Sequence, residues 1–238
     1  VKRASDGIAS KGHSWYPVWV IWRIFQRYRA NELASGITVL AGTQFLASFA
    51  GLIRDSLFGK VFADNRFVTD VYFAAFRPSD LLFQTCIISA LGTVVVPVLA
   101  QYKARGDRVE MAKVLNGTMI VMSLVFGIIA LGMGLAFPWI APHLVHFTGE
   151  QLQLYIQFGR IALFTNFLFV FGNALGQYLI TDQRYWIYGI TPIVYTCGTI
   201  FGTVVLTAKL GSFGPIAGTV LGVILYVFLR AIAVYRAG

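Results

Sequence analysis

Long apolar runs separated by short charged segments dominate the sequence. A helix needs about 20 apolar residues to cross the roughly 30 Å of hydrocarbon in a bilayer. Runs of this kind, with few or no charges, occupy residues 33–53, 81–100, 114–140, 154–180, 185–206 and 213–233. The pattern therefore predicts an all-α integral membrane protein whose residues 33–238 form one lobe of six transmembrane helices, the second of them beginning near Phe67.

The first 32 residues have a different pattern. They are rich in Lys and Arg, and the stretch SWYPVWVIWRIFQRYRA, residues 14–30, separates its tryptophans from Arg23 and Arg27 when it is drawn as a helix. This stretch is too short, and too interrupted by arginine, to cross a bilayer. We expect residues 1–32 to be a basic segment that carries an amphipathic helix lying in the headgroup layer.

Polar side chains interrupt the second span. Asp70, Arg77 and Gln84 recur at intervals of seven, which places them on one helix face, and Asp80 follows close by. A charge at the centre of a bilayer helix costs about 2.5–3.5 kcal/mol on insertion scales, so these residues are expected to line a cavity beside a kink at Pro78. The alternative is structural: Arg77 and Asp80 would form an internal pair, and Asp70 would sit in the first helical turn.

A further embedded cation is Arg160, in the fourth predicted span. It lies one or two turns into its helix. It is therefore a candidate for the same cavity, although an arginine at this depth can also extend its side chain to the membrane surface.

Small residues recur at four-residue spacing in the last three spans. The series are Gly172 and Gly176, Gly198 and Gly202, and Gly214, Gly218 and Gly222. This spacing lets helix backbones approach closely. Close helix packing is the expected result, and a sliding or hinge surface is the alternative.

The composition agrees with a membrane protein. Hydrophobic residues make up 57% and charged residues only 12%, against roughly 25% charged residues in soluble domains. The net charge of +9 does not indicate nucleic-acid binding, because most of the 19 Lys and Arg residues lie between spans. With the amino terminus in the cytoplasm, 13 of them, Arg230 included, fall on the cytoplasmic side and four on the other. Both termini are therefore expected inside.

No cofactor, metal site or enzyme activity is expected. Cys86 and Cys197 lie in apolar runs and predict no disulfide. His143 and His146 lack a third ligand nearby, and no nucleophile elbow, phosphate loop or zinc-protease helix is present. Coupling to a membrane potential or an ion gradient is left open.

One region resembles a known family. GLIRDSLFGKVFADNRFVTDVYFAAFRPSDLLFQ followed by VVVPVLAQYKARGD is similar to the start of MurJ/MviN-type lipid II flippases of the MOP superfamily, with its G-x-x-R-D, T-D-A-F-x-x-A-F-x-x-P and V-P-x-x-A-x-Y patterns. FPWIAP and LITDQRYWIYGITPIVY continue the likeness. The resemblance implies a MATE-like lobe in the bacterial inner membrane. A second such lobe, in the same longer chain or another subunit, would enclose a cationic cavity for a lipid-linked pyrophosphate sugar, with alternating access by rocking of the lobes.

By the same resemblance, Arg54 matches a cavity arginine, Asp55 its neighbouring acid and Asp70 the acid of the second helix. The chain also departs from the family pattern. Ser48 and Phe83 stand where the family has arginine, Ile88 stands where it has glutamate, and Pro78 is displaced by one residue. Arginine suits bidentate phosphate contacts, so the loss of these arginines is a physical objection to lipid II as the substrate.

Three functions are consistent with this pattern. The first is flipping of a lipid II-like, anionic lipid-linked precursor in peptidoglycan biogenesis. The second is a degenerate half-transporter that serves as a membrane scaffold or interaction subunit. The third is a multidrug or polysaccharide exporter of the same superfamily, which the basic first span disfavours.

Overall fold

Every element in the described part of the chain is helical. The computed structural model describes the backbone of residues 18–236 and the side chains of residues 34–236. The chain divides into two compact units, Val1–Thr38 and Val39–Gly238. The packing described below is that of the second unit.

The first helix runs through the boundary expected after residue 32. α1 (Val18–Val61) is one helix of 44 residues. Residues 1–17, and the side chains of residues 18–33, lie outside the described residues. The amphipathic interfacial helix at residues 14–30 therefore stays a prediction.

The first span is longer than predicted. Its expected end at residue 53 is wrong, because α1 continues past Arg54 and Asp55 to Val61. Arginine is a good helix former, so one charged pair does not stop a helix. The chain turns only near Asn65, a residue type that favours turns and helix caps. The longer helix carries Arg54 inside it.

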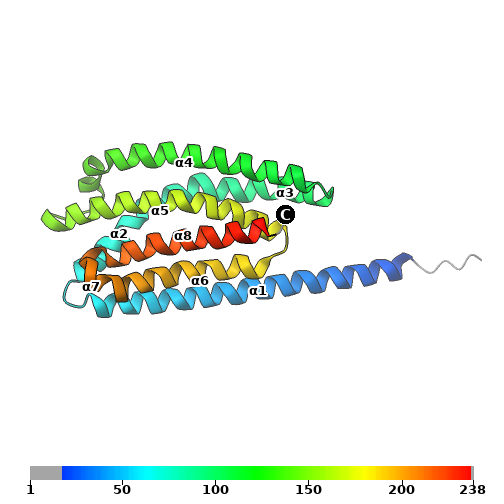
Figure 1. Cartoon of the computed structure of the whole chain (residues 1–238), viewed down its shortest axis with the longest axis horizontal. Helices are drawn as coiled ribbons and strands as arrows, with labels where there is room; N and C mark the ends of the chain where they lie inside the picture. Colours follow the sequence, from blue (N-terminus) through cyan, green and yellow to red (C-terminus); the bar gives the residue numbers. More distant parts are fainter. Residues whose placement is uncertain (1–17, 237–238) are drawn as a thin grey trace, which may run out of the picture. The chain divides into compact units, whose positions relative to one another are not determined.

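The remaining elements form long helical segments that run back and forth through the bundle (Figure 1). They are α2 (Arg66–Phe83), the π-helical η1 (Gln84–Ile88) and η2 (Leu91–Val95), α3 (Val96–Ala104), α4 (Arg108–Leu144), α5 (Gly149–Thr181), α6 (Tyr185–Phe201), the π-helical η3 (Gly202–Leu206), α7 (Thr207–Leu210), the 3-10 turn η4 (Gly211–Phe213) and α8 (Gly214–Tyr235). α2, η1, η2 and α3 together make one of the long segments. The third, fourth and fifth predicted spans fall within α4, α5 and the α6–η3 segment, and the sixth is essentially α8.

The second span contains two π-helical turns, in which the helix is wider than an α-helix. α2 continues as an α-helix through Pro78 to Phe83, and the π turns η1 and η2 follow before Pro97 at the start of α3. A proline inside a helix removes a backbone donor, and local π geometry is one way to accommodate such a gap. η2 ends two residues before Pro97, whereas η1 lies between the two prolines and closer to Pro78, at which α2 itself stays α-helical.

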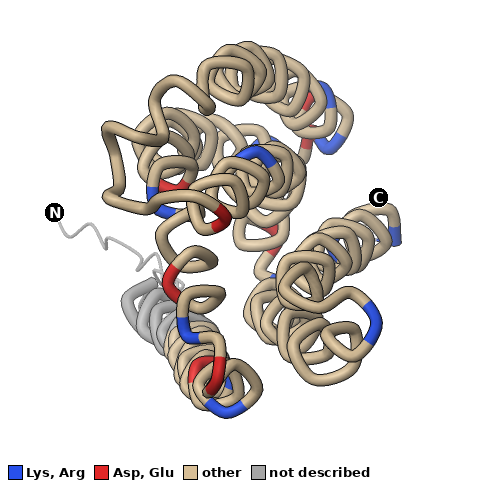
Figure 2. The backbone as a smooth tube through the Cα atoms, turned by 90° about the vertical axis from the view of Figure 1, so that its left-hand side faces the viewer, with Lys and Arg blue, Asp and Glu red and all other residues tan. Residues whose placement is uncertain are grey.

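Five helices in the described residues are long and apolar enough to cross a membrane. They are Ala34–Val61, Arg66–Ala104, Arg108–Leu144, Gly149–Thr181 and Tyr185–Tyr235. Figure 2, which looks along the bundle, shows that charged positions occupy only short parts of the chain and that most of it is uncharged. On α4, Ile120, Leu124, Ile128 and Leu131 are each at least 60% exposed. Apolar side chains exposed at helical spacing form a face suited to lipid.

α5 is the central helix of the bundle. It packs against α2, α4 and α8, and half of its most apolar stretch is buried, more than in any other candidate span of the described residues. One buried cluster joins it to α2 through Tyr72 and Phe158. A second joins it to α4 around Phe126 and Val170.

Arg230 corrects the predicted distribution of charge. We expected it at the cytoplasmic flank, but its side chain is only 1% exposed within the bundle. Its Nε donates to Thr191 Oγ1 at 2.8 Å, its Nη1 to the Gly172 carbonyl at 2.8 Å and its Nη2 to the Tyr188 carbonyl at 3.2 Å. The guanidinium also lies over the rings of Tyr188 and Tyr226. A single arginine thus ties α5, α6 and α8 together, and twelve cations remain in the expected cytoplasmic set.

The glycine spacing gives close packing between α6 and α8, as predicted. A Cβ at Gly198 would overlap the backbone of Gly222, and a Cβ at Gly202 would overlap that of Gly218. On α5 the glycines instead make room for large side chains, since Gly176 faces the guanidinium of Arg230. Figure 1 shows α6 and α8 side by side along their length.

We predict that Gly198→Ala lowers the stability of the protein in detergent by about 1–3 kcal/mol, because the added methyl group meets backbone that cannot move aside. The matched control is Gly132→Ala on α4, where nothing lies within 4 Å of the new Cβ. That control should be neutral or slightly stabilising. Thermal unfolding followed by size-exclusion chromatography measures both, and equal melting temperatures would contradict this packing.

Candidate functional site

A small polar pocket lies among α1, α2, α5 and α6. Its volume is about 180 Å³. Its lining consists of Arg54, Tyr72, Phe73, Phe76, Arg77, Asp80, Asn166, Phe169 and Tyr195. Three of the residues predicted from the sequence, Arg54, Arg77 and Asp80, therefore meet in one place although they come from two helices.

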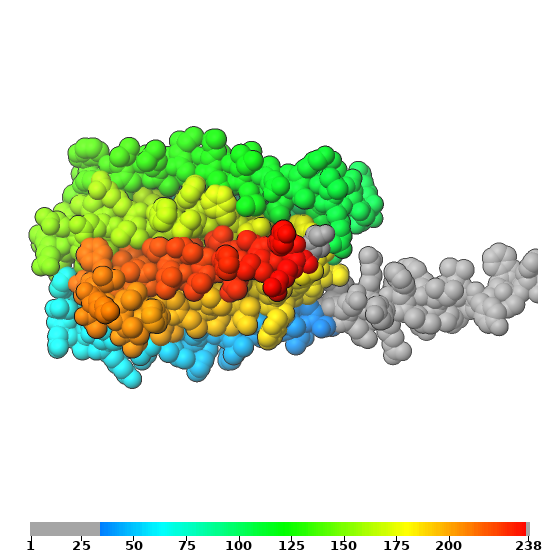
Figure 3. Space-filling model, in the orientation of Figure 1, coloured from blue at the N-terminus to red at the C-terminus, as the bar shows by residue number. Residues whose placement is uncertain are grey.

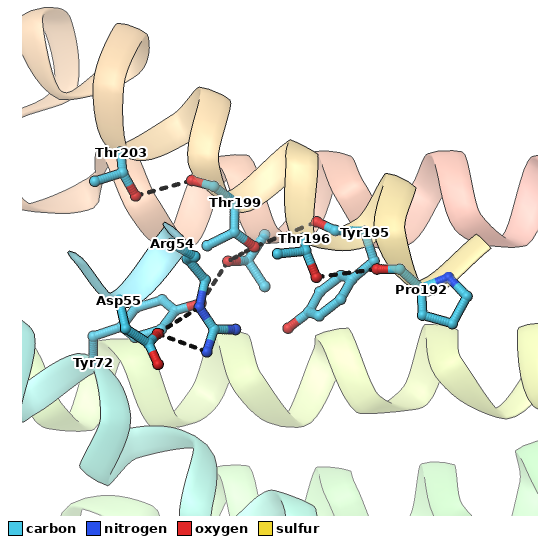
Figure 4. A network of polar contacts seen from close by, with 9 residues as sticks. Arg54, Asp55, Tyr72, Pro192, Tyr195, Thr196, Thr199 and Thr203 are labelled. Atoms are coloured by element: carbon cyan, nitrogen blue, oxygen red, sulfur yellow. Dashed lines mark hydrogen bonds and ion pairs between the residues drawn. The ribbon is translucent and has the colours of Figure 1, made fainter. Parts of the chain in front are cut away.

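Arg54 reaches the pocket from α1 and is held by its neighbour. Its Nε donates to Asp55 Oδ1 at 2.9 Å, and its Nη2 lies 2.8 Å from the same oxygen (Figure 4). The guanidinium stands 5.7 Å from the ring centre of Phe73. The Arg54 side chain is 20% exposed and that of Asp55 is 49% exposed. Asp55 does not line the pocket, and its carboxylate forms an ion pair with the partly accessible Arg54.

Asp80 is fixed from the opposite helix. Asn166 of α5 donates through Nδ2 to Asp80 Oδ1 at 2.9 Å and to Ser79 Oγ at 2.5 Å. Asn166 is 3% exposed and Ser79 is 1% exposed, whereas Asp80 is exposed. The buried amide therefore donates to one buried and one exposed group of α2. The hydrogen bonds hold α2 against α5 beside the pocket.

Arg77 is the second cation of the pocket lining, after Arg54. It is exposed, and among the described residues no ion pair joins it to Asp80. The internal pair considered as the structural alternative is therefore absent from this arrangement. The Asp80 carboxylate lines the same pocket but is not in ion-pair contact with Arg77, so the Arg77 guanidinium keeps its donors for an anionic ligand.

A network of hydroxyl groups connects the lining residue Tyr72 to α6 and α8. Tyr72 Oη lies 2.7 Å from Thr219 Oγ1, which lies 3.1 Å from Thr199 Oγ1. Thr203 Oγ1 donates to the Thr199 carbonyl at 2.9 Å. Figure 4 shows the ring of Tyr195 and the guanidinium of Arg54 on the same side of this network. The network joins α2, α6 and α8 and positions Tyr72.

The other predicted site residues lie elsewhere. Asp70 and Gln84 are exposed on α2 and η1 and do not line the pocket. Arg160 donates from Nε to the Gly134 carbonyl at 2.9 Å and lines a separate groove between α4 and α5. A contact between these three residues and a substrate stays a prediction.

Sequence reasoning missed Tyr72, Asn166 and Tyr195 as lining residues. Asn166 gave a signal, because a primary amide in an apolar span needs a partner. The tyrosines gave none, since aromatic residues are frequent along every span of this chain. Their role depends on which helices pack together.

The described residues contain no group of three or more His, Cys, Asp or Glu side chains that could hold a metal ion. His143 instead lies with Nδ1 3.1 Å from the Trp139 carbonyl, one helical turn away. Both belong to α4, whose end lies at Leu144. The pocket residues themselves offer the guanidinium groups of Arg54 and Arg77, which can donate to an anion, beside the carboxylate of Asp80.

The comparison with known families adds a decisive observation. The model of the lipid II flippase MurJ family matches residues 60–238. The chain belongs to the MurJ family. The match covers Arg77, Asp80, Asn166 and Tyr195, and it begins just after Arg54 and Asp55. Membership of the MurJ family, together with the candidate spans, indicates a multi-pass protein of the bacterial inner membrane.

The hydrogen bonds of Asn166 can be tested by substitution. We predict that Asn166→Leu lowers stability in detergent by about 1–3 kcal/mol, because the buried Ser79 hydroxyl and the Asp80 carboxylate lose the donor that joins α5 to α2. Asn173→Leu on the same helix is the control, since the Asn173 amide donates only to the Phe169 carbonyl of its own helix. A thermal melt of both variants compares them. Equal losses of stability would show that the hydrogen bonds from Asn166 to α2 contribute no more than the one that Asn173 makes within α5.

Proposed function

We propose that this chain is one lobe of a lipid II flippase in peptidoglycan biogenesis, and that the pocket attracts the pyrophosphate of the substrate. The observation that carries the proposal is the convergence of Arg54 and Arg77 in a membrane-embedded bundle of this family. Arginine pairs with phosphate through parallel hydrogen bonds. The role is transport, with no catalytic chemistry.

The small size of the pocket supports a substrate site that is shared between two lobes. Pockets that enclose a drug-sized ligand hold roughly 300–1,000 Å³, whereas this one holds about 180 Å³. It has room for part of a headgroup. In our proposal a second six-helix lobe, in the same longer protein or another subunit, closes over the rest, and rocking of the two lobes gives alternating access.

We propose six membrane spans. Tyr185–Tyr235 contains 51 residues, which would extend roughly 75 Å as one straight helix, more than twice the hydrocarbon thickness. Gly211 interrupts it at φ +55°, and α6 packs back against α8. An even number of spans puts both ends of the bundle on one side, and the bias of Lys and Arg favours the cytoplasm.

Phe83, which stands where the family pattern has arginine, lies in apolar surroundings. Phe83 is 8% exposed and packs edge-on against Phe126 at 5.7 Å between ring centres. A guanidinium would be costly there. Arg77, six residues earlier on α2, reaches the pocket instead. In our proposal it supplies the second cation that the family pattern has at other positions.

Arg77→Ala should reduce flipping at least about tenfold, the size of one charge-assisted hydrogen bond to phosphate. The assay depletes the endogenous flippase in cells and measures lipid II exposed on the outer leaflet. Arg66→Ala is the control, because Arg66 is an exposed arginine of the same helix that does not line the pocket. Equal flipping by the two variants, at equal protein levels, would favour a membrane scaffold instead.

Arg54 and Asp55 should act in opposite directions. Arg54→Ala should abolish flipping in the same assay, because the pocket loses its α1 cation. Asp55→Asn removes the carboxylate that competes for this guanidinium, so it should retain flipping and strengthen binding of a soluble pyrophosphate headgroup analogue. Calorimetry on the purified protein measures that affinity. Weaker binding by Asp55→Asn would mean that Asp55 orients Arg54 for the ligand.

A further inference from the structure

A second concavity lies between α4 and α5 and shares no lining residue with the pocket described above. Its volume is about 620 Å³. The two helices run side by side in Figures 1 and 3. Gly127, Ala130 and Gly134 of α4 line it, and their spacing of three and four residues puts them on one helix face. Small side chains on that face leave a groove where larger ones would fill the space.

The walls of the groove are apolar and open to the surroundings of the bundle. Leu131 is 67% exposed, Leu135 is 62% exposed and Phe164 is 53% exposed. In a membrane-embedded chain these side chains meet hydrocarbon. The volume falls within the range of ligand sites that hold small molecules. An extended lipid chain fits both the shape and the lining.

Arg160 is the one charged residue of this lining. Its Nε donates to the Gly134 carbonyl at 2.9 Å, and a guanidinium has four further N–H groups. Among the described residues, no carboxylate forms an ion pair with it. The guanidinium is therefore anchored to α4 at the groove and still has donors for an anion.

The depth of Arg160 suits a lipid phosphate. α5 has 33 residues and is roughly 50 Å long, so about 10 Å extend beyond the hydrocarbon at each end if the helix is centred. Arg160 lies eleven residues after Gly149, roughly 16 Å along the helix. An arginine side chain spans the remaining few ångströms to the headgroups.

We propose that this groove binds an anionic phospholipid of the bilayer, with one acyl chain along Gly127 and Gly134 and the phosphate on Arg160. From Arg160 to Phe167 the groove extends about 10 Å along α5, enough for the upper part of a chain. The unpaired cation selects a net negative headgroup over a zwitterionic one, whose own cation it would repel. The groove opens sideways to the bilayer, so a bilayer lipid enters it without passing the transport pocket.

The test is native mass spectrometry of the purified protein with an equimolar mixture of phosphatidylglycerol and phosphatidylethanolamine. The wild type should retain phosphatidylglycerol preferentially. Arg160→Gln should lower that preference about tenfold, the size of one charge-assisted contact, and Arg160→Lys should retain part of it. Lys209→Gln, which removes an exposed cation outside the groove, should match the wild type.

A second pair of variants tests the acyl chain. Gly134→Leu should fill the groove and abolish retention of either lipid there. The fold should tolerate this change, because the new Cβ meets only Leu163 Cδ1 at 3.8 Å. Gly132→Leu, two residues away with nothing within 4 Å of its Cβ and outside the lining, is the matched control and should bind as the wild type does.

Three results would overturn the proposal. One is an unchanged lipid preference in Arg160→Gln. Another is equal lipid retention by Gly134→Leu and Gly132→Leu. The third is preferential retention of a polyprenyl phosphate added at equal concentration, because the groove would then hold the tail of a transported lipid. Flipping assays on the same variants keep this test separate from that of the transport pocket.

Discussion

Arg230 sets the constraint on which the rest of the bundle depends. A cation in an apolar interior costs several kcal/mol unless polar groups surround it, and here the partners come from two neighbouring helices, the Gly172 carbonyl of α5 and the hydroxyl and carbonyl groups of Thr191 and Tyr188 on α6. Gly176 leaves room for the guanidinium on α5. The relative positions of α5, α6 and α8 are thereby fixed, and α5 in turn carries Asn166 to Asp80 and Ser79 of α2.

The polar pocket forms where this fixed frame meets α1 and α2. Asn166 and Tyr195 belong to the frame, whereas Arg54 and Arg77 project from the two earlier helices. Both cations are at least partly accessible, and one of them already shares a carboxylate with its neighbour. Under the proposed function, an anion entering the pocket meets Arg77, which forms no ion pair among the described residues, and Arg54, which must exchange Asp55 for the ligand. Such an exchange makes binding sensitive to small shifts of α1, which suits a site that must both take up and release its substrate.

Charged residues in this chain take three different roles that a sequence pattern cannot separate. Arg54 and Arg77 line the pocket, Arg230 stabilises the core, and Arg160 lies at a lipid-facing groove. All four are arginines in or near apolar runs. The stripe of Asp70, Arg77 and Gln84 illustrates the difficulty, because helical spacing predicted a shared face but only Arg77 lines the pocket. Position along a helix decides the face of a side chain, and the neighbouring helices decide what that face meets.

The amino-acid sequence by itself determined the class of protein, the approximate place of its apolar spans, the glycine series that permit close helix packing, and a family resemblance that the match over residues 60–238 confirmed. These follow from run length, spacing and local motif, which depend on near neighbours in the chain. Tertiary structure alone decided that Arg230 is buried and that Arg54 shares a pocket with Tyr195. It also decided that the hydrogen-bond partner of Asp80 is Asn166, and that Arg77 is not its ion-pair partner. Those contacts join residues tens or more than a hundred positions apart, and only the packing of whole helices brings them together.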